Sequence, residues 1–237
     1  MRLNLTAQTP SELLAKLAAT DITVPFRTEG RTASHGEAYM AARLLASLAE
    51  TVEITYPLKL IHREKPDFAL EMDGKTIGVE CTEAVSKEWA QIDAIRERDF
   101  PESLIMLPML KPGIKKFSLQ ERIAIAKGEF AGTPWVGGMA KRQWAEAQAY
   151  FIGEKTKKLR AGNYSDHAEV WLAVQDEWRV PMYGQEHTQT AAQMCLELLR
   201  PMLATPSFTR IYVSNSNWLV RLHPGPVEVR PICRLWN

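Results

Sequence analysis

Hydrophobic residues recur along this chain either at every second position, as in strands, or about every 3.6 residues, as in helices. The alternation at every second position is clearest around the dipeptide Asp73-Gly74. Asp-Gly is strongly preferred in a type I′ turn, because both central residues of that turn need a positive φ. On both sides of the dipeptide, apolar residues stand at alternate positions, as in half-buried strands. The pattern therefore predicts a β-hairpin over residues 66–83 in which Phe68 faces Val79 and Asp67 faces Glu80.

The predicted hairpin has one apolar face and one face that carries acids. The apolar face is expected to pack on the core and consists of Phe68, Leu70, Met72, Ile77, Val79 and Cys81. On the other face, Asp67 and Glu80 stand directly across from each other, roughly 5 Å apart at Cβ. Like charges so placed destabilise a sheet unless a shared proton, a basic group or a metal ion offsets them. The alternative is that both acids point into water.

Windows with the period of 3.6 residues predict helices before and after this hairpin. They cover residues 11–19, 34–50, 83–98, 140–159 and 187–203, with Ser11 and Ser34 as expected N-caps. Further strands are predicted at residues 51–55, 168–175, 208–213, 218–222 and 227–229. This order predicts an α/β fold with a mixed central β-sheet flanked by helices. We expect a single domain over residues 1–237, with an N-terminal arm or edge element at 1–33 and an irregular insertion at 100–139.

Two charged residues lie on the apolar stripes of predicted helices. Glu37 shares a helix face with Ala41 and Leu44, and it either closes a capping box with Ser34 or points at whatever that helix packs on. Lys155 lies within the apolar stripe of the helix at 140–159.

A lysine in the middle of an apolar stripe is uncommon. Either Lys155 extends its amine from the last turn into solvent, or it carries a cation to the hairpin acids. Gln148 lies on the same stripe as Lys155, whereas Lys157 lies on the opposite side of the helix.

Composition and charge exclude several classes of function. The net charge of +1 gives no global basic field that would indicate nucleic acid, although it leaves room for a local basic groove. The three cysteines are widely spaced without a CxxC motif, which argues for a reducing compartment and against a zinc site or a disulfide framework. No apolar run approaches about 18 residues and the first residues lack a signal-peptide pattern, so we expect a cytoplasmic protein without a membrane segment.

The insertion at residues 100–139 is locally basic. Its charges form either a solvated surface or a flap that touches a phosphate backbone. They are Lys111, Lys115, Lys116, Arg122 and Lys127. The glycine-rich segment at 132–138 has the spacing of a phosphate-binding loop, but Gly138 stands where that motif needs lysine, so no nucleotide site is expected there.

The hairpin sequence resembles the signature of the PD-(D/E)XK nuclease superfamily. Pro66-Asp67 matches the first half of that signature and Glu80-Cys81-Thr82 the second, with Thr82 where the family usually has lysine. The predicted order of elements is similar to the family's αβββαβ, restriction-endonuclease-like core. Glu37 stands where the first core helix often supplies an additional acid.

This resemblance implies metal-dependent hydrolysis of phosphodiester bonds in nucleic acid, with DNA as the expected substrate. It implies that Asp67 and Glu80 hold one Mg²⁺ or Mn²⁺, together with the backbone carbonyl of Cys81 and with Glu37 directly or through water.

The resemblance also offers a replacement for the lysine that is missing at Thr82. Members of the family are known to supply this cation from a neighbouring element, which makes Lys155 the first candidate and Lys158 the second. Lys155 would orient the attacking water or neutralise the phosphate, with Gln148 as a polar partner. The alternative is a non-catalytic module that keeps the nuclease fold and binds nucleic acid or takes part in an assembly. The missing lysine favours this alternative.

Overall fold

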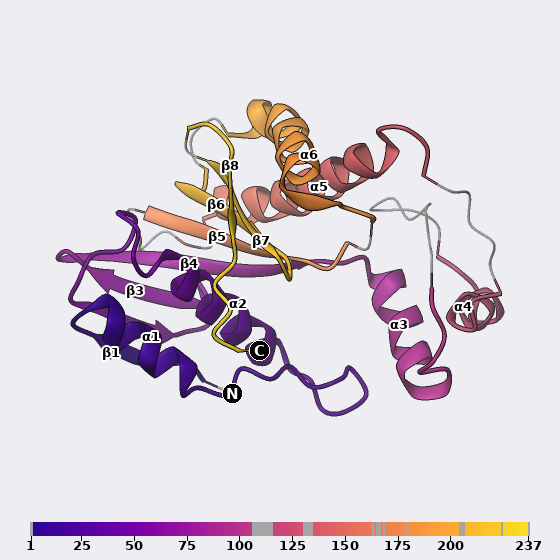
Figure 1. Ribbon diagram of the computed structural model, residues 1–237, viewed down its shortest axis with the longest axis horizontal. Coiled ribbons are helices and arrows are strands. Elements are labelled where there is room, and N and C mark those ends of the chain that lie inside the picture. Colours follow the sequence, from indigo (N-terminus) through magenta and orange to yellow (C-terminus); the bar gives the residue numbers. More distant parts are fainter. Residues whose placement is uncertain are drawn as a thin grey trace.

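The described residues form one mixed β-sheet of eight strands with helices on both faces (Figure 1). The computed structural model describes residues 2–105, 116–129, 135–162, 164, 167, 169–178, 180–203, 207–223 and 225–236. The strands follow one another across the sheet in chain order. They are β1 (Leu5–Ala7), β2 (Leu58–His62), β3 (Phe68–Met72), β4 (Lys75–Ala84), β5 (Glu169–Asp176), β6 (Arg210–Ser214), β7 (Trp218–His223) and β8 (Glu228–Pro231).

Strand direction changes in the middle of the sheet. The first four strands pair antiparallel, β4 to β5 and β5 to β6 pair parallel, and the last three pair antiparallel. A parallel pair needs a long crossover connection, and here helices supply both crossovers. Strands β4 and β5 therefore lie at the centre of the sheet and are covered on both faces, as expected for the apolar run at 168–175.

The helices lie in two layers and one smaller group (Figure 1). One face of the sheet is covered by α2 and the other by α5 and α6, while α3 packs against α4 beyond the end of β4. The helices are α1 (Pro10–Ala18), α2 (Ala33–Leu48), α3 (Lys87–Asp99), α4 (Leu119–Ala126), α5 (Met139–Arg160) and α6 (Gly184–Leu199), followed by the 3₁₀ turn η1 (Arg200–Met202). No helix in the described ranges has the length and apolar character needed to cross a membrane.

The hairpin has the predicted turn and register. Asp73 and Gly74 have φ values of 50° and 67°, as a type I′ turn requires. Phe68 pairs with Val79 and Leu70 pairs with Ile77. All six residues of the predicted apolar face are buried in the core beneath α2, which confirms that this face is a core face.

The predicted strand at residues 51–55 is wrong. Thr51 ends α2 with turns, because its backbone N–H and its hydroxyl both donate to the carbonyl of Leu48. Val52 is 98% exposed, whereas Glu53 is 8% exposed and is bound by Arg230. Val52 therefore points outward while Glu53 and Ile54 are both buried, so the side chains do not alternate between two faces as they would in a strand. The second strand of the sheet is instead β2, and it ends at His62.

Both expected N-caps are displaced by two residues. Thr9 caps α1 in place of Ser11, and Thr32 precedes α2 in place of Ser34. His35 closes the capping box at α2 by accepting the backbone N–H of Thr32 at its Nδ1, 3.1 Å away. Glu37 therefore has no capping role, and its carboxylate is available to the neighbouring strands.

Other boundaries also differ from the expectation. Glu83 belongs to β4, and α3 begins at Lys87. The expected arm at residues 1–33 contains the edge strand β1 and the helix α1, and the expected insertion contains α4.

Part of the predicted basic flap can be examined in the structure. Lys111 and Lys115 lie outside the described residues. Arg122 binds Glu88 on α3 through its guanidinium, and Lys127 lies over the ring of Phe100. Both side chains therefore contribute to the packing of α4 against its surroundings.

We expect Gly78 on β4 to be required for the position of the segment that carries Asp67. A Cβ at this position would lie 2.6 Å from Cγ of Pro66 and 3.3 Å from the ring of His167. Gly78→Ala should lower the free energy of unfolding by about 1–3 kcal/mol, the usual cost of forcing atoms into a packed site. Urea denaturation measures this change. Thr76→Val is the control on an exposed position of the same strand and should change stability by about 0.5 kcal/mol or less.

Candidate functional site

The hairpin brings Asp67 and Glu80 together at the start of β3 and the middle of β4. The register of Phe68 with Val79, continued by one residue, puts Asp67 opposite Glu80. The backbone N–H of Cys81 donates to Oδ2 of Asp67 over 2.6 Å, which fixes this carboxylate against β4. Glu80 is 6% exposed. The two acids therefore share a largely dehydrated environment.

Lys155 reaches the hairpin acids from α5. Its Nζ lies 2.5 Å from Oε1 of Glu80 and 3.1 Å from the carbonyl oxygen of Cys81. The amine thus lies beside the acids, as the phase of the helix predicted. Lys158, the second candidate for this role, is exposed, and Lys157 pairs with Glu154 on the outer surface of the helix.

Burial and nearby charges control the protonation of Asp67. Its pKa is raised from 3.8 to about 7, chiefly by burial and also by the charges of Glu80 and Glu37, although the hydrogen bond from Cys81 and the charge of Lys155 lower it. The single ammonium of Lys155 therefore does not balance the carboxylates around it. The site has an excess of negative charge that a proton or a further cation would neutralise.

Glu37 lies at the start of α2 and is oriented by His62. Oε2 of Glu37 and Nε2 of His62 are 3.0 Å apart, and the backbone N–H of Leu3 donates to Nδ1 of the same ring. Since Nδ1 accepts a hydrogen bond, we assign the proton to Nε2, which donates to Glu37. The imidazole ring also lies 4.3 Å from the ring of Phe68. Sequence reasoning missed His62, because its role depends on the pairing of β2 with β3.

Tyr164 is a second residue that sequence reasoning missed. Its phenol is hydrogen-bonded to Glu80, and burial together with this bond raises the pKa of the phenol. The side chain is largely buried, although its neighbours in the chain have no periodic pattern. No signal in the sequence separated this tyrosine from an ordinary core aromatic residue.

Gln148 does not lie where it was expected. Its Nε2 donates to Oδ1 of Asp176 over 2.8 Å, and Nε1 of Trp144 donates to Oδ2 over 2.6 Å. The pKa of Asp176 is raised to about 6, chiefly by burial, with the hydrogen bonds from Trp144 and Gln148 acting in the opposite direction. This network joins α5 to the end of β5. Gln148 is two helical turns before Lys155, so the network helps to set the rotation that aims Lys155 at Glu80.

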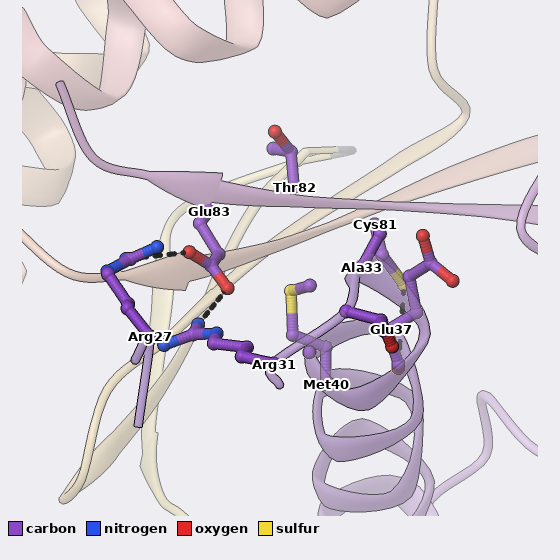
Figure 2. A pocket seen from close by; sticks show the side chains of 10 residues that line it. Arg27, Arg31, Ala33, Glu37, Met40, Cys81, Thr82 and Glu83 are labelled. Carbon is purple, nitrogen blue, oxygen red and sulfur yellow. Dashed lines mark hydrogen bonds and ion pairs between the residues drawn. The ribbon is translucent and has the colours of Figure 1, made fainter. Parts of the chain in front are cut away.

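Two hollows open on either side of Glu37. One has a volume of about 400 Å³ and is lined by Glu37, Cys81, Glu83 and two arginines of the N-terminal arm (Figure 2). The other, of about 520 Å³, is lined by Glu37, Asp67, His62 and the arginines Arg2 and Arg63. Glu37 and Asp67 therefore lie next to open space that is bordered by cationic side chains, whereas Glu80 lines neither hollow.

The donors at this site are of the type that Mg²⁺ or Mn²⁺ prefers. They are the carboxylates of Asp67 and Glu80 and the carbonyl of Cys81, while Glu37 is turned toward His62. Within the described ranges, no three His, Cys, Asp or Glu side chains converge as a ready-made metal cage. Magnesium commonly binds to one or two carboxylates, with water and substrate oxygens completing its shell. The donor set and the raised pKa of Asp67 are consistent with such a site.

Comparisons with known proteins give no relative for this chain. No protein-family model, curated protein or solved structure matches it. The geometry of the site and the resemblance of its short motifs are therefore the grounds on which a function can be proposed.

We expect Asp67 to make stability depend on pH. Its folded-state pKa is raised above 3.8 to about 7, so its contribution to stability is present below about pH 4 and is lost as the pH rises through 7. Asp67→Asn removes this titration. The variant should match the wild type near pH 4 and be more stable at pH 8, by at most a few kcal/mol at about 1.4 kcal/mol per pKa unit.

Melting temperatures in chelator from pH 4 to pH 8 measure this effect. Subtracting the wild-type curve from that of the variant cancels other groups that titrate in the same range, such as Asp176. A difference that stays constant over the whole range would contradict the assignment of a raised pKa to Asp67.

Proposed function

We propose that this protein hydrolyses phosphodiester bonds in nucleic acid with the help of a divalent metal ion. The observation that carries the proposal is the contact of 2.5 Å between Nζ of Lys155 and Oε1 of Glu80. Through this contact, Lys155 supplies the positive charge that the nuclease motif would have from a lysine at the position of Thr82. A lysine from a separate helix thus compensates for the change in the motif.

The order of elements supports the same proposal. Helix α2 precedes the antiparallel strands β2, β3 and β4, and α5 precedes β5, which lies parallel to β4. This is the order expected for a restriction-endonuclease-like αβββαβ core.

In the proposed reaction, each side chain has a separate task. Asp67, Glu80 and the Cys81 carbonyl would hold Mg²⁺ or Mn²⁺. When bound, such an ion supplies charge neutralisation at the phosphate and makes water more acidic. Lys155 places a positive charge where negative charge develops on the phosphate oxygens.

Two further side chains orient these groups. Tyr164 donates a hydrogen bond to the carboxylate of Glu80 and so helps to orient it. His62 holds the carboxylate of Glu37 at the border of the two hollows.

A second candidate function rests on the same lysine. Its amine contacts Oε1 of Glu80 and the carbonyl of Cys81, which are two of the atoms that would otherwise serve as metal ligands. If the ammonium stays there permanently, it takes the place of a metal ion. The protein would then be a non-catalytic module that binds nucleic acid or takes part in an assembly.

We expect Lys155→Met to lower phosphodiester cleavage by about 10²-fold or more, the scale of losing one electrostatic stabiliser. Methionine keeps much of the apolar packing of the lysine stem. Cleavage of labelled DNA and RNA with Mg²⁺ should be compared at a temperature at which both proteins are folded, because removal of a buried cation also lowers stability. Lys157→Met is the control on the exposed side of α5 and should cleave as the wild type does. Wild-type activity in Lys155→Met would show that Lys155 is not the catalytic cation.

Metal binding separates the two candidate functions. If the site takes Mg²⁺, the melting temperature of the wild type should rise by about 5 °C or more when the ion exceeds its Kd a hundredfold. Glu80→Gln should remove most of this rise. A wild type without any response to Mg²⁺ or Mn²⁺, and without cleavage, would favour the non-catalytic module.

A further inference from the structure

Two arginines of the N-terminal arm meet at Glu83, on the face of β4 opposite Thr82 (Figure 2). The terminal nitrogen of Arg27 lies 3.3 Å from one carboxylate oxygen of Glu83, and Arg31 contacts the other oxygen. Gly36 at the start of α2 makes room for this contact, since a Cβ there would lie 2.9 Å from Oε1 of Glu83. The backbone N–H of Arg27 is held by Glu97 on α3. The two guanidinium groups are therefore fixed in place.

Glu83 uses only part of the hydrogen-bonding capacity of these arginines. A guanidinium carries five N–H donors, and the contacts to Glu83 take one terminal nitrogen from each side chain. Both side chains line the cavity of about 400 Å³ and are 23% and 21% exposed. Two positive charges face the one carboxylate of Glu83, so these three side chains together carry one excess positive charge, and Glu37 is the other acid that lines the cavity. A planar guanidinium group with several N–H donors, lying in such a cavity, is well suited to bind an oxyanion.

Glu80 and Lys155 line neither hollow at Glu37, and Glu37 is the acid that the candidate site shares with the arginine cavity. Glu37 and Cys81 line it, and Glu37 also lines the hollow that contains Asp67 and Arg63. A nucleic-acid strand lying past Asp67 would therefore have its next phosphates near Arg27 and Arg31.

Beyond the two arginines, the charged side chains that line the surface are mainly acidic. A third hollow of about 290 Å³ shares Arg31 and Glu83 with the arginine cavity and adds Glu97 and Glu177. Arg31 is the only cationic side chain among its described lining residues. Carboxylates repel a phosphate backbone, so a strand is not favoured to continue in this direction.

We propose that Arg27 and Arg31 bind a phosphate group of the nucleic-acid strand, and the acidic hollow favours a phosphate at the end of that strand. This inference rests on the proposed function for the identity of the strand. The same chemistry could come from a terminal phosphate or from an internal phosphodiester, and the experiment must distinguish the two.

The test is fluorescence anisotropy in chelator, with single-stranded oligonucleotides that carry a 5′-phosphate, a 3′-phosphate or hydroxyls at both ends. The expected result is binding about tenfold tighter for one phosphorylated end, the scale of a charge-assisted hydrogen-bonded contact. Arg27→Gln/Arg31→Gln should abolish this preference. Equal binding of the three oligonucleotides, weakened about tenfold by the same double variant, would assign the arginines to an internal phosphate. Arg234→Gln, at an exposed position outside the three hollows, is the control and should bind as the wild type does.

If the double variant does not fold, binding of the same oligonucleotides by Glu83→Gln provides a second test. Removal of the competing carboxylate charge should tighten binding of the preferred oligonucleotide several-fold. A purely structural cluster would lose stability in Glu83→Gln and leave binding unchanged.

The inference is overturned if a folded double variant binds all three oligonucleotides as the wild type does, or if Glu83→Gln leaves their binding unchanged. Because the measurement needs no metal ion and no cleavage, its outcome is separate from that of the proposed function. A wild type that cleaves but shows no role for the arginines contradicts only this inference, and one that binds through them without cleaving contradicts only the hydrolytic function.

Discussion

Asp67 and Glu80 are like charges held together in a largely dehydrated place, and much of the structure around them can be understood from this constraint. Two carboxylates that are largely shielded from bulk water repel each other and lose part of their hydration. The hairpin register forces them together, and the hydrogen bond from Cys81 holds Asp67 in place. Lys155 offsets part of the charge, while burial, followed by the charge of Glu80, raises the pKa of Asp67. Such a site has a strong tendency to take up a proton or a cation, which is a useful property in a metal-dependent enzyme.

The position of Lys155 depends on packing far from the acids. Trp144 and Gln148 attach α5 to the buried carboxylate of Asp176 at the end of β5. Apolar residues of the same helix, such as Ile152, are buried in a cluster with residues of β5, β6 and α6. A small rotation of α5 would move the amine away from Glu80. The polar network is therefore part of the support of the site, although it does not touch the acids.

Local chemistry predicted the hairpin and the helix phase well. Asp73-Gly74 determines the turn, the turn determines the register, and the register determines which residues face Glu80. The phase of α5 was equally sufficient to place Lys155. Gln148 was expected beside Lys155 because both lie on one face of α5. That face contacts both Asp176 and Glu80, and the sequence does not show which of these acids each polar residue binds.

The remaining differences depend on contacts between distant segments. The prediction of a strand at residues 51–55 was wrong because Glu53 is turned inward, where it binds Arg230 from a distant part of the chain. His62 and Tyr164 have their roles only because β2 and the segment before β5 are brought next to the acids. The arginine cluster at Glu83 likewise joins the arm to β4. No periodic pattern in the sequence indicates such contacts.

The central claim is that Asp67 and Glu80 form a divalent-metal site served by Lys155. The most direct measurement is anomalous X-ray scattering from crystals of the wild-type protein soaked in Mn²⁺. We predict an anomalous peak at the oxygens of Asp67, Glu80 and the Cys81 carbonyl, with the amine of Lys155 nearby. Crystals that show Lys155 still bound to Glu80 and Cys81, and no peak at these oxygens, would contradict this account.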